Sequence, residues 1–282
     1  VDALQAEEHT VAMTGDGVND VLALKHADIG IAMGTGSPAT KAVSQLVLLD
    51  NRFATLPSVV AEGRRIIANM ERVASLFVTK TVYATVLAIV IGFAGLPFPF
   101  LPRHLTLIGT LTIGLPGFFH SFEPTSEPVR SGFLSRVMRF AVPAGLAAAV
   151  VTFGLYGLAR SSLVSATLQE SRTGATITMV MLGFWILLEL IRPLDRGRAI
   201  MVTSLVGAFG LTLALPFARD FFDLVLPGAE GWAVISVGVL IGMLLIDVSL
   251  NVTEVVYQRW LRKHPDPEAA GGTMPVPDRR EP

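Results

Sequence analysis

Six long apolar runs fill most of residues 76–252 and constrain the fold more than any other feature of the chain. They lie roughly at Leu76–Gly95, Leu105–His120, Phe140–Leu158, Thr176–Ile191, Ala199–Phe217 and Trp232–Val252. About 20 helical residues, at roughly 1.5 Å of rise each, cross a hydrocarbon core about 30 Å thick. Buried core helices are the alternative, but such helices would keep polar faces that these runs lack. The sequence therefore predicts an all-α bundle of six transmembrane helices.

The composition of the whole chain agrees with a membrane protein. Of 282 residues, 51% are hydrophobic and 16% are charged, whereas about a quarter are charged in soluble domains. The mean hydropathy is +0.58. A net charge of −1 argues against nucleic acid as a partner, because such binders present a basic surface. The absence of cysteine excludes disulfides, thiolate metal sites and cysteine nucleophiles.

Arginine and lysine are distributed unequally between the two sides of the predicted bundle. If the residues before the first run are cytoplasmic, 17 of these side chains lie on the cytoplasmic side and four outside. This excess follows the positive-inside rule. We therefore expect a multi-pass protein of the plasma membrane with both ends of this chain in the cytoplasm. Residues 253–282, rich in proline, glycine and charge, are expected to form a disordered cytoplasmic tail.

The first 57 residues have the pattern of a mixed α/β domain. Short apolar runs at Thr10–Met13, Ile29–Met33 and Leu46–Asp50 are typical of buried strands. Helical stretches at Val18–His26 and Pro38–Ser44 alternate with them. Alternating strands and helices predict a parallel, doubly wound, Rossmann-like sheet. In such sheets the chemistry collects in the loops that follow the strands.

The loop Gly15–Asp20, directly after the first predicted strand, carries the strongest chemical signal. Asp16 and Asp20 stand four residues apart with Asn19 between them, and glycines let the backbone approach a ligand. Mg²⁺ binds through few carboxylates and retained waters, so this loop could hold it beside a phosphoryl group. The alternative is a tight turn in which Asp16 caps the following helix.

These residues also resemble the hinge signature of the P-type cation-transporting ATPases. The resemblance is closest to the bacterial, especially actinobacterial, cation-transporting ATPase E group. It covers about residues 10–125 and is highly specific. The stretches that carry it are Met13-Thr14-Gly15-Asp16-Gly17-Val18-Asn19-Asp20, Ala27-Asp28-Ile29-Gly30-Ile31-Ala32-Met33-Gly34, Glu62-Gly63-Arg64-Arg65-Ile66 and Gly114-Leu115-Pro116.

The resemblance implies roles for the residues of the loop. Asp16 would ligate Mg²⁺, Asn19 would contact an acyl phosphate, and Asp20 would support the same metal site. Gly15 and Gly17 would let the backbone approach the bound phosphoryl group. A metal that bridges phosphoryl oxygens neutralises the charge that develops during transfer. The implied role of the two aspartates therefore agrees with the chemistry of phosphoryl transfer.

The resemblance also implies a division of the chain into four parts. Residues 1–57 would end a haloacid-dehalogenase-like phosphorylation domain, 58–75 would form a stalk helix, 76–252 the membrane domain and 253–282 the tail. The chain begins at Val1 without an initiator methionine, and no Asp-Lys-Thr-Gly-Thr stretch occurs in it. We therefore expect a C-terminal part whose partner is the N-terminal remainder of the same polypeptide. That remainder would supply the phosphorylated aspartate and most contacts to ATP.

Polar groups inside the predicted spans are candidates for an ion pathway, because burial in hydrocarbon is costly unless they are paired. We expect Thr81, Thr112 and Glu189 to contribute oxygen ligands, and Lys80 to act as a countercharge or to neutralise Glu189. The wider set of candidates comprises Thr79, Tyr83, Thr85, Thr110, His120 and Asp247. Threonines often bond only to their own helix, and Lys80 could instead extend to the cytoplasmic face. Pro116 cannot donate to the Thr112 carbonyl, which could then coordinate.

The predicted ion pathway departs from the calcium-pump pattern. Thr81 and Ala84 stand where that pattern has an asparagine and a glutamate, and Gly109 and Ile113 stand where it has an asparagine and an aspartate. The chain matches polar positions of that pattern at two residues, Thr112 and Glu189. The sequence therefore favours at most one ion site, formed by Glu189, threonine oxygens and groups from a span that precedes this chain.

Three functions are compatible with this order of motifs. An ion-translocating ATPase accounts for the loop, the stalk and the six runs together, with Ca²⁺ as the cation by resemblance and Mg²⁺ or another cation as alternatives. A haloacid-dehalogenase-type phosphatase remnant on a membrane anchor accounts for the loop but needs only one or two spans. A channel-like module leaves the loop without a role.

Overall fold

The computed structural model describes residues 1–120, 132–161, 164 and 166–263. The chain divides into two compact units, residues 1–65 and residues 66 onward. Each unit has its own architecture. The part of the predicted tail beyond residue 263 lies outside the described residues.

The first unit contains a small parallel sheet, as the alternating pattern predicts. Its strands are β1 (Ala12–Gly15), β2 (Ile29–Met33) and β3 (Leu46–Leu48), in the order β1-β2-β3. Met13 pairs with Gly30, and Ile31 pairs with Leu46. Parallel pairing brings the carboxyl ends of all three strands to one edge.

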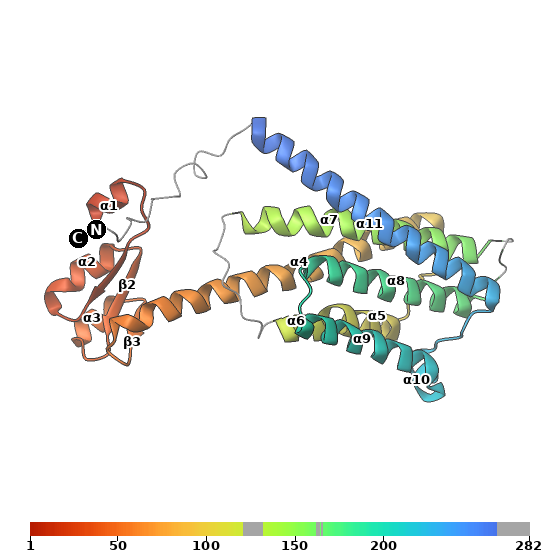
Figure 1. Cartoon of the computed structure of the whole chain (residues 1–282), viewed down its shortest axis with the longest axis horizontal. Coiled ribbons are helices and arrows are strands. Elements are labelled where there is room, and N and C mark those ends of the chain that lie inside the picture. Colours follow the sequence, from red (N-terminus) through yellow and green to blue (C-terminus); the bar gives the residue numbers. More distant parts are fainter. Residues whose placement is uncertain (121–131, 162–163, 165, 264–282) are drawn as a thin grey trace. The chain divides into compact units, whose positions relative to one another are not determined.

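Short helices connect the strands of this sheet (Figure 1). They are α1 (Asp2–Ala6), a 3₁₀ turn at Val18–Asp20, α2 (Val21–His26) and α3 (Pro38–Val43). Helices α2 and α3 contact each other. The two crossovers therefore cover the same face of the sheet, as two connections of the same hand do. Leu24, Ile31, Ala32 and Leu48 form the buried centre of this small unit.

The opposite edge of the sheet is fixed by Asp28, which precedes β2. Its carboxylate accepts hydrogen bonds from the Val11 backbone N–H at 2.8 Å and from the Gln5 amide at 3.1 Å. These two donors, the Val11 N–H first, hold the pKa of the Asp28 carboxyl below its usual value. The bonds tie α1 and the start of β1 to β2.

Helix α4 (Leu56–Ala94) is a single helix of 39 residues. A short 3₁₀ turn at Phe53–Thr55 precedes it. The helix contains the charged segment after the α/β domain and the first predicted span. Both lie in one unbroken helix.

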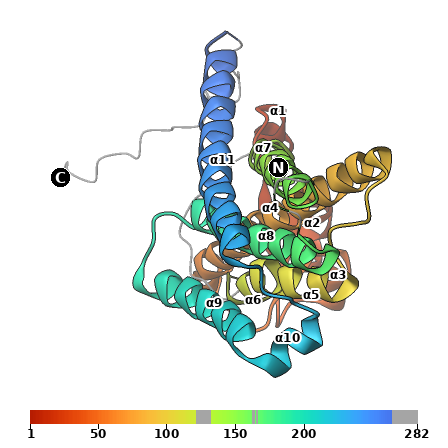
Figure 2. The same ribbon diagram turned by 90° about the vertical axis from the view of Figure 1, so that its right-hand side faces the viewer.

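The second unit consists of the remainder of α4 and a series of further helices. These are α5 (Pro102–Gly109), a π-helical turn at Thr110–Gly114, α6 (Leu115–His120), α7 (Phe133–Ala159), α8 (Leu168–Leu190), α9 (Arg196–Ala214), α10 (Pro216–Phe222) and α11 (Ala229–Lys263). Helices α7, α8 and α11 lie side by side, whereas α9 bends sharply into the short α10 (Figure 2).

Five helices in the described part of the chain are long and apolar enough to cross a membrane. They include α4, α7, α8, α9 and α11. The predicted count of six is not confirmed, because the second apolar run is divided among α5, the π-helical turn and α6. Pro116 gives the physical reason: it has no N–H for the α-helical ladder, and the turn before it takes up an extra residue.

The prediction that disorder begins at residue 253 is wrong for its first part. Helix α11 continues to Lys263. After Gly242, the sequence has no glycine or proline before Pro265, so nothing in it ends the helix at the predicted span. The last helical residues, 253–263, mix polar, charged and aromatic side chains with three aliphatic ones.

The first connection of the second unit is fixed by side chains of other helices. The Tyr156 hydroxyl on α7 donates to the Pro97 carbonyl at 2.7 Å, and Arg172 Nε on α8 donates to the Phe98 carbonyl at 3.1 Å. His104, fully buried on α5, lies with Nε2 2.9 Å from the Phe222 carbonyl of α10. These bonds position the segment that leads into the π-helical turn.

Small residues let the helices of this unit approach closely. A Cβ added to Gly145 on α7 would lie 2.7 Å from Val82 Cβ and 3.0 Å from the Thr79 carbonyl oxygen of α4. In the same helix, a Cβ added to Gly154 would meet no atom within 4 Å. Gly145 is therefore a packing position, whereas Gly154 is open.

Substitution of these two glycines tests the α4–α7 contact. Gly145→Ala should lower the free energy of unfolding by about 1–3 kcal/mol, because a backbone carbonyl cannot move aside as a flexible side chain would. Gly154→Ala should leave stability unchanged or slightly raise it. Thermal unfolding of the purified chain in detergent measures both. Equal unfolding temperatures for the two variants would contradict this packing.

Candidate functional site

The loops that follow the three strands are hydrogen-bonded to one another at the carboxyl edge of the sheet. The Ser37 N–H donates to the Asp16 carbonyl at 2.9 Å, which joins the loops after β1 and β2. The Thr35 N–H donates to Asn51 Oδ1 at 2.8 Å, which joins the loops after β2 and β3. Asn51 adopts a positive φ of 55°, a conformation that asparagine tolerates. The edge is thus one connected structure.

Asp20 is held against the backbone of the first loop. Its Oδ2 accepts from the Asp16 N–H at 3.2 Å and from the Gly17 N–H at 3.1 Å. A Cβ added to Gly15 would lie 2.6 Å from the Asp20 Cβ. Gly15 is therefore required for this close approach.

The alternative in which Asp16 caps the helix is wrong. Gly17, in extended conformation, directly precedes the 3₁₀ turn, and the carboxylate that binds loop N–H groups belongs to Asp20. The Asp16 and Asn19 side chains are exposed at the edge. Their polar atoms are consequently accessible to a ligand.

The oxygen ligands at this edge suit a magnesium ion that is also bound by a phosphate group. They do not suit a metal ion that is enclosed by protein ligands alone. Among the described residues, no group of three or more histidine, cysteine or carboxylate side chains could enclose a metal. Mg²⁺ keeps several waters and uses one or two carboxylates together with substrate oxygens. Asp16 offers an exposed carboxylate, and Asp20 has one oxygen committed to the backbone.

Thr40 and Ser37, which were not among the predicted site residues, hold the loop after β1 in place. Thr40 on α3 is fully buried, and its hydroxyl donates to the Gly17 carbonyl at 2.9 Å. Ser37 caps the same helix, since its Oγ accepts from the Thr40 N–H at 3.1 Å. A serine followed by proline is a known signal for a helix start, so Ser37 could have been identified from sequence.

The third loop carries its own fixed carboxylate. Asp50 accepts from the Thr55 hydroxyl and from the Arg52 N–H. These donors, the Thr55 hydroxyl first, hold the pKa of the Asp50 carboxyl below its usual value. Asp50 fixes the turn after β3, next to Asn51.

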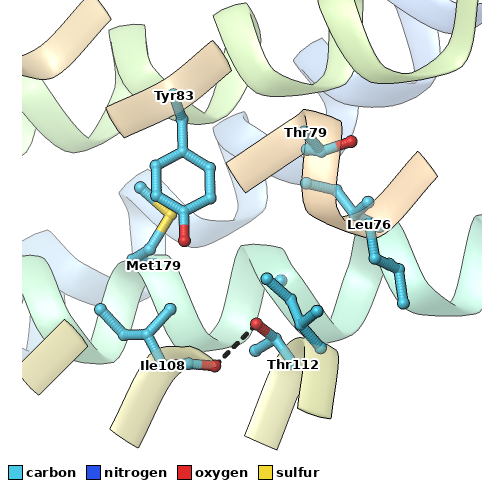
Figure 3. A pocket seen from close by; sticks show the side chains of 9 residues that line it. Leu76, Thr79, Tyr83, Ile108, Thr112 and Met179 are labelled. Carbon is cyan, nitrogen blue, oxygen red and sulfur yellow. Dashed lines mark hydrogen bonds between the residues drawn. The ribbon is translucent and has the colours of Figure 1, made fainter. Parts of the chain in front are cut away.

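A small cavity of about 20 Å³ lies within the second unit, between α4, the α5–α6 segment and α8 (Figure 3). Such a volume suits about one water-sized group. Its lining is mostly apolar and includes three hydroxyl groups. The lining residues are Leu76, Thr79, Tyr83, Ile108, Thr112, Ile113, Met179, Gly183 and Ile186.

The three hydroxyl groups differ in how they are bonded. Thr79 Oγ1 donates to the Ser75 carbonyl at 2.7 Å, and Thr112 Oγ1 donates to the Ile108 carbonyl at 2.8 Å. The buried Tyr83 hydroxyl has no hydrogen-bond partner among the described residues. Figure 3 shows the Tyr83 ring extending from α4 toward Ile108 and Thr112.

One of the four predicted ion-pathway residues, Thr112, lines this cavity. Thr81 is exposed and donates to the Phe77 carbonyl of its own helix at 3.0 Å. Lys80 does not line the cavity either; a Cβ added to Gly109 would lie 3.1 Å from its Nζ. On α4 the cavity is lined by Leu76, Thr79 and Tyr83.

Glu189 does not line the cavity, and the predicted pair with Lys80 is wrong. Its Oε1 lies 2.8 Å from Arg192 Nη2, one turn further along the chain. The physical reason is proximity: Arg192 follows the end of α8, so it reaches Glu189 without crossing the bundle. The other predicted intramembrane acid, Asp247 on α11, accepts from Trp185 Nε1 at 2.7 Å.

Comparison with known proteins agrees with both units. The haloacid dehalogenase-like hydrolase family matches residues 1–55. The calcium-transporting ATPase CtpE of Mycolicibacterium smegmatis is 47% identical over 236 residues, 79% of this chain and 30% of that protein. CtpE of Mycobacterium bovis is 47% identical over 255 residues, 86% of this chain and 32% of that protein. The resemblance to the P-type cation ATPases is confirmed.

A more distant relative extends the same resemblance. The probable cation-transporting ATPase exp7 of Streptococcus pneumoniae is 34% identical over 236 residues, which are 79% of this chain and 30% of that protein. The chain therefore spans about a third of the length of the curated relatives that it matches.

Proposed function

We propose that this chain is part of a P-type ATPase that forms an aspartyl phosphate from ATP and moves a cation, Ca²⁺, across the plasma membrane. One observation carries the proposal: relatives named as calcium-transporting ATPases are 47% identical over 79% and 86% of this chain, which is more than its second unit alone. A phosphatase on a simple anchor would need neither five long apolar helices nor these relatives.

In the first unit, Asp16 and Asp20 would hold Mg²⁺ at the carboxyl edge of the sheet. When bound, the metal neutralises negative charge on phosphoryl oxygens. Asp20 keeps the loop in shape through two backbone N–H groups. The exposed amide of Asn19 would donate to an acyl-phosphate oxygen, while Thr40 and Ser37 hold the loop in place from α3.

Coupling between the chemistry and the membrane is assigned to α4. The helix is continuous from Leu56 to Ala94 and includes the stalk segment 58–75. A hydrogen-bonded helix resists stretching and sharp bending, so a displacement at one end is transmitted along it. On this proposal the helix carries Thr79 and Tyr83 into the transport path.

The cavity beside the π-helical turn is proposed as part of the transported-ion site. The hydroxyl groups of Thr79 and Thr112 donate to carbonyls of their own helices, and their oxygens keep lone pairs for a cation. Ca²⁺ takes six to eight oxygen ligands, so most of them must come from elsewhere, including backbone carbonyls near Pro116. Lys80, close to Gly109, is proposed as a countercharge when the site has released its ion.

The first test concerns phosphoenzyme formation. In the whole protein, Asp16→Asn should reduce labelling from radioactive ATP and Mg²⁺ by about two orders of magnitude or more, because a charged metal ligand is lost. Glu7→Gln, which removes an exposed carboxylate of the same unit, is the matched control and should label normally. Near-normal labelling of Asp16→Asn would refute the assignment of this loop.

The second test concerns the ion site and compares two threonines with the same local bond. Thr112→Val should raise the Ca²⁺ concentration that half-activates ATP hydrolysis about tenfold or more, because one oxygen ligand is removed. Thr212 on α9 also donates to its own helix, to the Ala208 carbonyl at 2.9 Å, but does not line the cavity. Thr212→Val should leave the Ca²⁺ dependence unchanged; equal behaviour of both variants would place the ion site elsewhere.

The proposed topology has six spans, with the α5–α6 segment as the second, and both ends of the chain in the cytoplasm. Because the native sequence has no cysteine, introduced cysteines report it cleanly. Gly132→Cys and Gly197→Cys should react with an impermeant maleimide only from the cytoplasmic side, and Ser161→Cys only from outside. Labelling of Ser161→Cys from the cytoplasm would overturn this arrangement.

A further inference from the structure

Two arginines near the start of α7, Arg136 and Arg139, differ sharply in their partners. Arg136 Nε and Nη2 donate to Glu71 Oε1 and Oε2 of α4 at 2.8 and 2.7 Å. This two-point pair occupies both oxygens of the carboxylate. Arg136 therefore has a structural partner within the chain.

Arg139, one helical turn later, has no such partner. Its guanidinium carbon lies 3.6 Å from the centre of the Tyr257 ring on α11. Its Nη1 lies 3.6 Å from Glu254 Oε2, which is beyond hydrogen-bond length. Both Nε and Nη1 are shielded from solvent, and neither has an acceptor among the described residues. Because buried donors nearly always have acceptors, the arrangement indicates an acceptor from outside the chain.

The position of Arg139 along the predicted spans indicates where that acceptor is found. Arg139 directly precedes the apolar run 140–158, and Tyr257 follows the end of the last run by five residues. Tyr257 stacks on Trp260, with ring centres 6.2 Å apart and an interplanar angle of 18°. Aromatic pairs of this kind are typical of the boundary between hydrocarbon and lipid headgroups.

The charges and the apolar surface around Arg139 indicate which chemical class of acceptor binds there. Basic side chains at the end of α11 outnumber the single carboxylate of Glu254, whose side chain is 56% exposed and can turn toward water. The basic residues are Arg259, Arg262 and Lys263. On the same helix end, Val256 and Trp260 are more than half exposed. An anionic group with an attached hydrocarbon chain fits this surface better than a free anion.

We propose that Arg139, stacked on Tyr257, binds the phosphodiester of an anionic phospholipid. Arginine is the side chain best suited to phosphate oxygens, and its stacking on an aromatic ring fixes the plane of the guanidinium. The Nε–H donates to a phosphate oxygen, the Nη1 edge stays toward Glu254, and the acyl chains lie along Val256 and Trp260. The choice of the cytoplasmic leaflet rests on the proposed topology.

The test counts lipids retained by the purified full chain. The protein in detergent is incubated with phosphatidylglycerol or phosphatidylcholine, and bound lipids are counted by native mass spectrometry. Wild type should retain phosphatidylglycerol at least about tenfold more tightly than phosphatidylcholine, and Arg139→Gln should lose this preference. Arg139→Lys, which keeps the charge and removes the planar fork, should weaken retention several-fold and covers the case in which Arg139→Gln does not fold.

Arg259→Gln is the matched control, because it removes the same charge from an exposed position on the same helix end. It should retain phosphatidylglycerol within about twofold of wild type. Equal retention by wild type, Arg139→Gln and Arg139→Lys would overturn the proposal, and so would equal retention of the two lipids by wild type. Complete displacement of phosphatidylglycerol by millimolar inorganic phosphate would overturn the lipid assignment in favour of a free phosphate. The measurement needs neither ATP nor a transported cation, so its failure is distinct from failure of the proposed pump activity.

Discussion

A peptide group in hydrocarbon has no water to bond with, so each N–H and C=O must find its partner inside the protein. This constraint explains the long helices of the second unit. Where the second apolar run would form another such helix, Pro116 removes one donor, and the backbone takes up a π-helical turn at Thr110–Gly114. The proposed ion cavity lies at that turn, where Thr112 and Ile113 meet α4 and α8. A local defect in backbone bonding and an opening for a polar ligand thus have the same cause.

The same constraint acts on polar side chains, which find their hydrogen-bond or ionic partners in different ways. Thr79 and Thr112 satisfy their hydroxyl protons within their own helices, and each oxygen keeps lone pairs. The Tyr83 hydroxyl reaches across the cavity instead and has no partner among the described residues. Glu189 and Asp247, which are far more costly to bury, are paired with Arg192 and Trp185. A cation that entered the cavity would therefore be coordinated by neutral oxygens. We expect these oxygens alone to give it only a modest affinity, which further ligands would have to raise.

Much of the fold could be predicted from the sequence because its signals are local. The runs that form β1, β2 and β3 are short, apolar and closed by glycine-rich or polar turns, so the three strands and their parallel pairing could be predicted. The loop at Gly15–Asp20 could be located because Asp and Gly fall right after a strand. The fold-back of Asp20 onto the Asp16 and Gly17 N–H groups was not predictable, since it depends on the absence of a side chain at Gly15.

It was harder to predict which side of each membrane helix faces the interior of the bundle, and the reason is physical. A helix that is apolar all round has no polar face to mark the side exposed to lipid. Lys80 and Thr81 drew attention as polar groups in the first span, whereas the buried stripe of α4 runs through Leu76, Thr79 and Tyr83. Their spacing of three and four residues is the signal that could have found the cavity side. The same difficulty applies to α11, where the apolar run ends at Val252 but the helix continues to Lys263.

Arg136 and Arg139 show why residue type alone does not determine a role at a membrane boundary. Both are arginines on successive turns of α7, and both are largely removed from water. For Arg136, two hydrogen bonds to Glu71 compensate the loss of hydration. For Arg139, a ring face compensates part of it, but an aromatic face accepts no hydrogen bond from Nε or Nη1 in the plane of the guanidinium. The remaining cost of burying those donors falls only when an acceptor arrives in that plane, and at the level of the headgroups the acceptor at hand is phosphate.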